Sequence, residues 1–134
     1  TRHEGLDELA RMHAQRMLAR QKMDHDDYHK RLGMAEKYYD MGGLRENVAH
    51  GRGFSRGDMS RVMVEGWIRS SGHRRNLLAK TSHYGVGIAI GEGGSFYSAQ
   101  VTASPVVPPQ KNSFRRGMPI SYSNNYGAAM GPAW

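Results

Sequence analysis

Trp-Ile-Arg-Ser-Ser-Gly-His-Arg-Arg-Asn-Leu-Leu, at residues 67–78, decides the fold together with Glu-Asn-Val-Ala at residues 46–49. The two segments place an acid and a histidine at a fixed spacing around a tryptophan and the start of a helix. The pattern Tyr-Gly-Val-Gly-Ile follows at residues 84–88 and is typical of a strand that could hold both segments against a sheet. We therefore expect Glu46 and His73 to meet beside a hairpin, in a polar cleft.

The composition limits the class of protein. A chain of 134 residues is long enough for one domain with one ordinary core. The absence of cysteine excludes thiolate zinc sites and a cysteine nucleophile, and it favours a reducing compartment or a bacterial export route. No apolar run approaches the length of about 18 residues that a membrane span needs, so no transmembrane segment is predicted.

The charge points to acidic partners. The net charge is +7 and the pI is near 10.0, which favours nucleic acid, anionic lipid or an acidic protein surface. Base-reading motifs are absent, so nucleic acid is the unlikely member of this group. We expect one or more protein partners with an acidic surface.

Hydrophobic spacing predicts two helices in the first third of the chain. Residues 4–22 carry one apolar stripe, and His13 lies in it as an expected hydrogen-bonded core residue rather than a ligand. Asp24 or Asp26 is predicted to cap a second helix that runs through about Asp40, with Gly42-Gly43 as its stop signal. Its inward residues are expected to be Leu32, Ala35 and Tyr39.

The middle of the chain predicts a strand, two helices and a hairpin. Residues 44–50 form a short strand or an extended segment, and a glycine-rich loop leads to helices at 59–70 and 72–79. Residues 84–91 and 95–102 alternate in hydropathy around Glu-Gly-Gly, which indicates a β-hairpin. Gly85 and Gly87 share one face, so we expect a helix or an aromatic ring to approach the first of these strands closely.

The composition changes at Ser104. All five prolines follow it, no acid appears after Glu92, and the segment carries a charge of +3. Such a segment packs no core of its own, so we predict one domain at residues 1–103 and a basic, extended, partner-binding tail at 104–134. The anchors of that tail are expected to be Phe114, Arg115, Arg116, Tyr122, Tyr126 and Trp134.

The order of these motifs resembles a known family. His25, then Glu46-Asn47, then Trp67 with Gly-His-Arg-x-Asn-Leu at residues 72–77, then Gly-Val-Gly, is similar to the CAP superfamily. These are the cysteine-rich secretory, antigen 5 and pathogenesis-related-1 proteins, also called SCP domains. The likeness runs from residue 5 to residue 103 and is nearest to the cysteine-free bacterial-type branch.

The resemblance implies an α+β fold, an α-β-α sandwich with a small antiparallel sheet between helical layers. It also implies a cleft of two histidines and two glutamates that can bind a divalent metal, often zinc. Carried onto this chain, the cleft residues are His25, Glu46 and His73, while Ser70 stands where the second acid belongs. Their supporting residues are expected to be Asn47, Trp67, Ser70 and Asn76.

The chain also departs from the family pattern at its start. The resemblance implies a first helix with an Asn-x-x-Arg pattern before residue 4, and this helix is either missing or outside residues 1–134. We expect its absence to uncover one layer of the sandwich, with the tail as a replacement cover.

Three functions follow from this reading. The first is a non-catalytic binding or scaffold module that docks in a larger intracellular assembly, such as a cytoplasmic or cytoskeletal one, through its basic surface and its tail. The second is a secreted or periplasmic protein that binds a lipid, a sterol or a divalent metal. The third is a metal-dependent hydrolase, in which zinc held by two imidazoles and a carboxylate activates a water. The first requires no cofactor and no catalytic residue.

Overall fold

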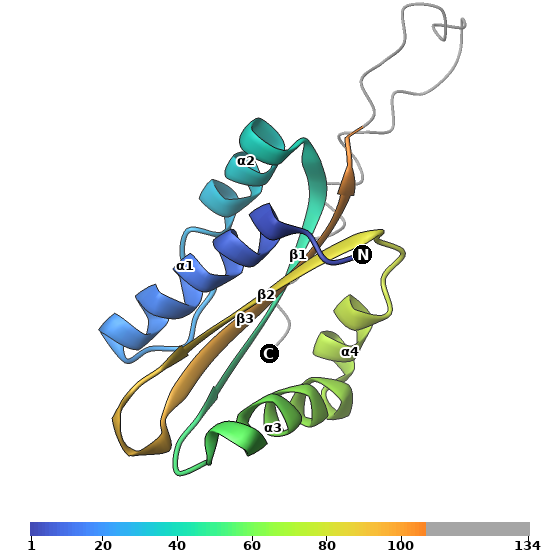
Figure 1. Cartoon of the computed structure of the whole chain (residues 1–134). Helices are drawn as coiled ribbons and strands as arrows, with labels where there is room; N and C mark the ends of the chain where they lie inside the picture. The colour runs from blue at the N-terminus through green and yellow to red at the C-terminus, as the bar shows by residue number, and fades with distance from the viewer. Residues whose placement is uncertain (107–134) are drawn as a thin grey trace, which may run out of the picture.

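The computed structural model describes residues 1–106, so most of the predicted tail, including all of its anchors, lies outside the described residues. In the described part of the chain four helices and three strands form three layers, with the sheet between α1 and α2 on one side and α3 and α4 on the other (Figure 1). The predicted α+β sandwich is therefore confirmed. The elements are α1 (Glu4–Arg20), α2 (Tyr28–Tyr39), β1 (Met41–Gly51), α3 (Arg56–Arg69), α4 (Ser71–Leu77), β2 (His83–Ile90), the 3₁₀ turn η1 (Glu92–Gly94) and β3 (Phe96–Pro105).

The sheet is antiparallel, with the strand order β1-β3-β2. The predicted hairpin is present, because β2 pairs with β3 from His83 opposite Ala103 to Ile90 opposite Phe96. Its turn contains Gly93 and Gly94, both at positive φ, where a side chain would be strained. β3 is the central strand, and β1 is an edge strand that carries Glu46 and Asn47.

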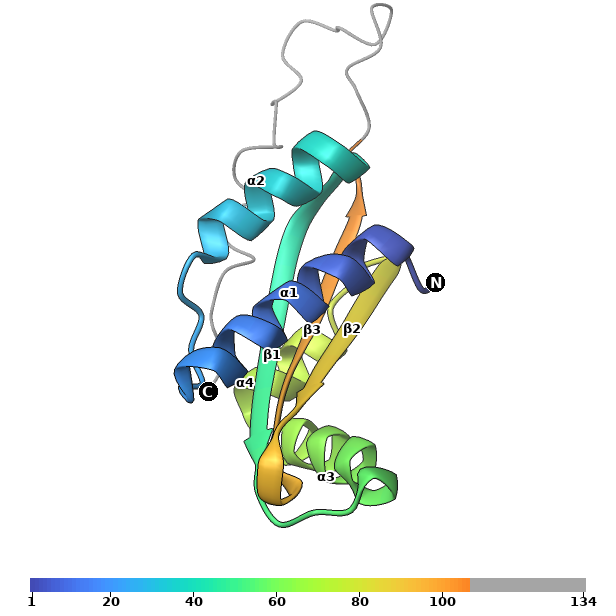
Figure 2. The ribbon, with the colours of Figure 1, turned by 60° about the vertical axis from the view of Figure 1, so that its left-hand side comes forward.

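Helix α1 lies directly on β2, as the paired glycines predicted. A Cβ added at Gly85 would clash with the backbone of Leu6 and Asp7, and one added at Gly87 would clash with the backbone of Arg11. Only glycine leaves room for the helix backbone at this distance. Figure 2 shows α1 crossing the sheet face on this side.

Each face of the sheet has its own hydrophobic cluster. The larger cluster joins α1, α2 and the sheet and includes Leu6, Leu9, Met17, Leu44 and Val101. The smaller one packs Met59, Met63 and Trp67 of α3 against Phe96. Burial of side chains on both faces accounts for the three-layer arrangement.

The predicted stop signal and the predicted start of the second helix were wrong. Helix α2 ends at Tyr39, close to the predicted end near Asp40, but Asp40 in the left-handed conformation ends it, and Gly42-Gly43 belongs to β1. Aspartate tolerates this conformation through its short polar side chain. The helix also begins after Asp27, not at Asp24 or Asp26, whose carboxylates bind Arg20 instead.

Within residues 1–106, none of the helices combines the length and the apolar character needed to cross a membrane.

Candidate functional site

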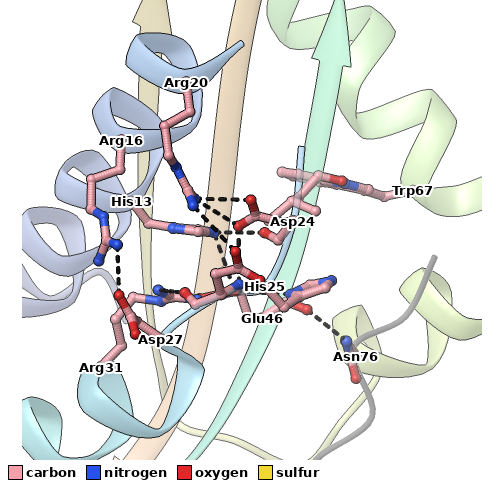
Figure 3. A network of polar contacts seen from close by, with 12 residues as sticks. His13, Arg16, Arg20, Asp24, His25, Asp27, Arg31, Glu46, Trp67 and Asn76 are labelled. Carbon is pink, nitrogen blue, oxygen red and sulfur yellow. Dashed lines mark hydrogen bonds and ion pairs between the residues drawn. The ribbon is translucent and has the colours of Figure 1, made fainter. Parts of the chain in front are cut away.

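The candidate site is built around Glu46, a buried carboxylate on the edge strand β1. Arg31 of α2 donates two hydrogen bonds to it, from Nε to Oε2 at 2.6 Å and from Nη2 to Oε1 at 2.7 Å. His25 Nδ1 lies 2.9 Å from Oε1. Figure 3 shows these side chains converging from the loop after α1, from α2 and from β1. We call His13, His25, Arg31 and Glu46 the Glu46 cluster.

His13 completes the cluster from α1. Its Nε2 lies 2.8 Å from the carbonyl oxygen of Asp24 and 3.6 Å from Glu46 Oε1. A carbonyl oxygen only accepts, so Nε2 carries the proton. The prediction of a hydrogen-bonded core histidine is confirmed.

The Glu46 cluster keeps its carboxylate ionised. Burial alone raises the pKa of Glu46, but the hydrogen bonds from His25 and Arg31 and the charge of Arg31 bring that pKa below its ordinary value of 4.5. The pKa of His13 is also lowered, below 6.5, and burial is the largest cause. For a histidine this shift favours the neutral form, whereas for Glu46 it favours the charged form. Burial and the negative charge of Glu46 also raise the pKa of Tyr28 to about 12.

The motif residues act on the backbone of β1. Trp67 Nε1 donates to the carbonyl oxygen of Val48 at 2.9 Å, and Asn76 Nδ2 donates to that of Glu46 at 3.1 Å. The hydroxyl of Tyr28 donates to the carbonyl of Leu44. These three carbonyls belong to every second residue of an edge strand. Unpaired backbone groups on such an edge can form hydrogen bonds with a strand of another chain. Side chains from both helical layers therefore close this edge.

Asn47 ties the second histidine to the sheet. Its Nδ2 donates to the carbonyl oxygen of His73 at 3.2 Å and to Gln100 Oε1 at 3.1 Å, and its Oδ1 accepts from Asn76 at 3.0 Å. Burial lowers the pKa of His73, and the charge of His25 lowers it further. Neither ring nitrogen of His73 has a hydrogen-bond partner among residues 1–106. His73 and Glu46 thus lie on neighbouring segments, with no direct bond between their side chains in that part of the chain.

The Glu46 cluster does not fit zinc, the ion that the family resemblance implies. Both oxygens of Glu46 accept from Arg31, so an added cation would face the guanidinium. Nowhere in residues 1–106 do three or more histidine, aspartate or glutamate side chains gather in a way that could hold a metal ion. His25 and Glu46 are joined by a hydrogen bond, whereas the His73 side chain is linked to His25 through electrostatics, with no hydrogen bond within residues 1–106.

Comparison with known proteins identifies the family and a structure of similar fold. The family model described as the cysteine-rich secretory protein family, CAP, matches residues 1–102. The chain belongs to the CAP family. A solved outer surface protein from Borrelia burgdorferi is similar in structure, with a TM-score of 0.63 and 16% sequence identity over 78% of this chain and 76% of that chain. At this identity the likeness shows the fold alone. A search of curated proteins finds no significant match.

Ser70 has a structural place in this CAP domain. It lies between α3 and α4, where its N–H donates to Gly66 and its carbonyl accepts from Arg74 at 2.8 Å. The change of direction here brings His73 and Asn76 onto the sheet. Glu65, the nearest acid, is paired with Arg61 at the surface, so it does not replace the missing carboxylate.

Arg31 is the functional residue that sequence reasoning missed. It lies four residues before Ala35, on the inward face of α2, and only 6% of its side chain is exposed. An arginine at an inward position is a sign of a buried acid that needs a counter-ion. That sign, combined with Glu46 on a buried strand, could have predicted the pair.

Proposed function

We propose that this CAP domain is a non-catalytic binding module that docks with a protein partner through its basic surface and its C-terminal tail. The observation that carries the proposal is that the Glu46 carboxylate is held in hydrogen bonds within the domain. A general base or a metal ligand needs an available lone pair, and three contacts, two from Arg31 and one from His25, already occupy most of the acceptor positions of the Glu46 carboxylate. The cluster is suited to holding α1, α2 and β1 together.

The charge supports binding to an acidic surface. The full chain carries +7, of which +3 comes from the tail. A field of one sign steers oppositely charged partners and raises their association rate. The proposed anchors in the tail are Phe114, Arg115, Arg116, Tyr122, Tyr126 and Trp134.

The setting that we favour is the secreted or periplasmic one, in place of the larger intracellular assembly. The Borrelia relative is an outer surface protein by its title, and cysteine-free chains are compatible with bacterial export. The partner in this proposal is then a protein of an outer surface or envelope.

The test uses the full chain and a fluorescent peptide of alternating glutamate and leucine, with a lysine–leucine peptide as the control. We expect the chain to bind the acidic peptide, with an affinity that falls as salt rises. Replacement of Lys111, Arg115 and Arg116 by serine should weaken that binding. Selective zinc-dependent ester or peptide hydrolysis that is lost in His73→Ala, without binding of the acidic peptide, would establish the hydrolase instead.

A further inference from the structure

The net charge of the described chain is concentrated in one segment. Residues 1–51 hold nine basic and nine acidic residues, and residues 81–106 hold a single acid and no base. Residues 52–80, which contain α3 and α4, hold seven basic and two acidic residues. The layer on one side of the sheet therefore carries +5, while the α1–α2 segment is neutral.

Most of the cations in this layer have no acidic partner. Among them Arg61 alone is paired, with Asp58 and Glu65. The others form no ion pair with any residue of the described part of the chain, and all are exposed. These are Arg52, Arg56, Arg69, Arg74, Arg75 and Lys80. Their charge is available to a partner.

Exposed aliphatic side chains lie among these cations. Val64 and Ile68 are 42% and 49% exposed, and they lie four residues apart on one flank of α3, each next in sequence to a buried residue, Met63 or Trp67. Leu78, just after α4, is 76% exposed. Such residues on a charged surface are typical of an interface centre with a basic rim.

One hydrogen bond links a cation of this layer to a residue with an exposed aliphatic side chain. Arg74 Nη1 donates to the backbone carbonyl oxygen of Ile68 at 3.1 Å, so the guanidinium lies at the last turn of α3, where Ile68 is located. We define the α3–α4 surface as Val64, Ile68, Arg69, Arg74, Arg75, Leu78 and Lys80. Figures 1 and 2 show that α3 and α4 lie on the side of the sheet away from α1 and α2.

From this arrangement we infer that the α3–α4 surface is the docking site for an acidic protein segment that also presents aliphatic side chains. The inference rests on the proposed function and assigns the docking to the layer formed by α3 and α4. Arginine suits carboxylates because its planar fork binds them in a bidentate manner. Carboxylates of the partner would meet the arginines, and its aliphatic side chains would cover Val64, Ile68 and Leu78.

Two other partners fit this surface less well. Surfaces that enter a membrane interface commonly combine leucine with aromatic anchors such as tryptophan or phenylalanine, whereas α3 and α4 expose no aromatic side chain and Trp67 is buried. Single-stranded nucleic acid is bound by stacking of bases on aromatic side chains, and these two helices expose none.

The experiment compares two triple variants of the full chain that lose the same charge. Arg69→Ala/Arg75→Ala/Lys80→Ala changes the α3–α4 surface, and Lys22→Ala/Lys30→Ala/Lys37→Ala changes the neutral segment. The probe is the glutamate–leucine peptide, measured by fluorescence anisotropy over a series of salt concentrations. The first variant should lose about tenfold in affinity and show a shallower salt dependence, since each exposed pair contributes a few-fold. The second variant should bind as the original chain does.

A second variant separates the aliphatic contribution. Ile68→Ser should weaken binding about fivefold and leave the salt dependence unchanged, because it removes apolar contact but no charge. Circular dichroism of each variant checks that the fold is retained.

Each remaining outcome decides against part of the proposal. Equal weakening by the two triple variants would overturn the placement on α3–α4 but leave the binding module standing. No binding of the acidic peptide by the original chain would overturn both. If vesicles of phosphatidylserine and phosphatidylcholine, or an oligonucleotide, depend on these residues more strongly than the peptide does, the surface belongs to that partner and the inference is wrong.

Discussion

Replacement of Arg31 by methionine should destabilise the domain strongly. Methionine fills much of the same volume, but it removes both hydrogen bonds to Glu46 and the only fixed positive charge of the Glu46 cluster. The side chains of Arg31 and Glu46 are 6% and 1% exposed, so water cannot replace the lost partner.

The magnitude follows from this burial. Removal of one member of a buried ion pair leaves an uncompensated charge and costs about 3–5 kcal/mol. We expect Arg31→Met to lower the free energy of unfolding by that amount. The matched control is Arg61→Met, because Arg61 pairs with Asp58 and Glu65 while 58% of its side chain is exposed. That change should cost at most about 1 kcal/mol.

Urea denaturation followed by circular dichroism measures both changes, with an unchanged slope as the check on two-state behaviour. The double variant Arg31→Met/Glu46→Gln should recover about 2 kcal/mol or more relative to the sum of the single changes, because it removes both charges. Arg31→Met should also lose part of its deficit as pH falls. Without Arg31, burial raises the pKa of Glu46, so the carboxyl is neutral in the folded variant at mildly acidic pH.

Equal costs for Arg31→Met and Arg61→Met, both below about 1 kcal/mol, would refute this reasoning. Such a result would mean that Glu46 is solvated or protonated, and that the Glu46 cluster is not the bond between α2 and β1.

Three further changes test other parts of the fold. Trp67→Phe keeps an aromatic ring but removes the N–H that binds the Val48 carbonyl, so the free energy of unfolding should fall by about 1–2 kcal/mol. Gly85→Ala forces α1 away from β2 and should cost about 3 kcal/mol or more, read by the same urea titration. Because burial lowers the pKa values of His13 and His73, the unfolded chain binds protons more readily, and stability should fall as pH drops through 6.5.

Controls for these changes come from the same chain. Gly33→Ala meets no atom within 4 Å and lies inside α2, so it should raise stability by as much as about 1 kcal/mol. His73→Asn should flatten the pH dependence, whereas His29→Asn, at an exposed position, should not. A stability that rises on acidification would contradict the account of the two buried histidines, and a neutral Gly85→Ala would contradict the close packing of α1.

Much of the fold is visible in local sequence. The stripe on residues 4–22 places α1, and the glycine pair at 85 and 87 predicts its close approach to β2 because only a missing side chain allows it. The hairpin follows from alternation around a glycine turn. These features depend on neighbouring residues, so periodicity is enough to find them.

The partners of Glu46 depend on distant residues and are harder to find. His25 and His13 reach the same carboxylate from the loop and from α1, and Arg31 comes from α2. Helix periodicity identified Leu32 and Ala35 as inward residues but gave no reason to pair Arg31 with a strand. The length of β1 was missed for a similar reason, since Gly42 is held in the strand by pairing with Ser104.

The same limit applies to the motif around Trp67. Its spacing indicated a family, but the role of Trp67 and Asn76 as donors to alternate carbonyls of β1 needs the strand order. That order places β1 at the edge, and it arises from packing of the whole sheet. The proposed docking is harder still to predict, because it depends on which surface charges remain unpaired after folding.

The most direct test of the central claim is a pH titration of the Glu46 side-chain carboxyl by ¹³C NMR, with amide spectra recorded in parallel to confirm that the chain is folded. A carboxylate held by Arg31 and His25 should titrate below 4.5, the ordinary value. A midpoint well above that value in the folded chain would show a carboxyl that is free to bind a metal or a proton, and it would contradict the assignment of Glu46 as a structural counter-ion.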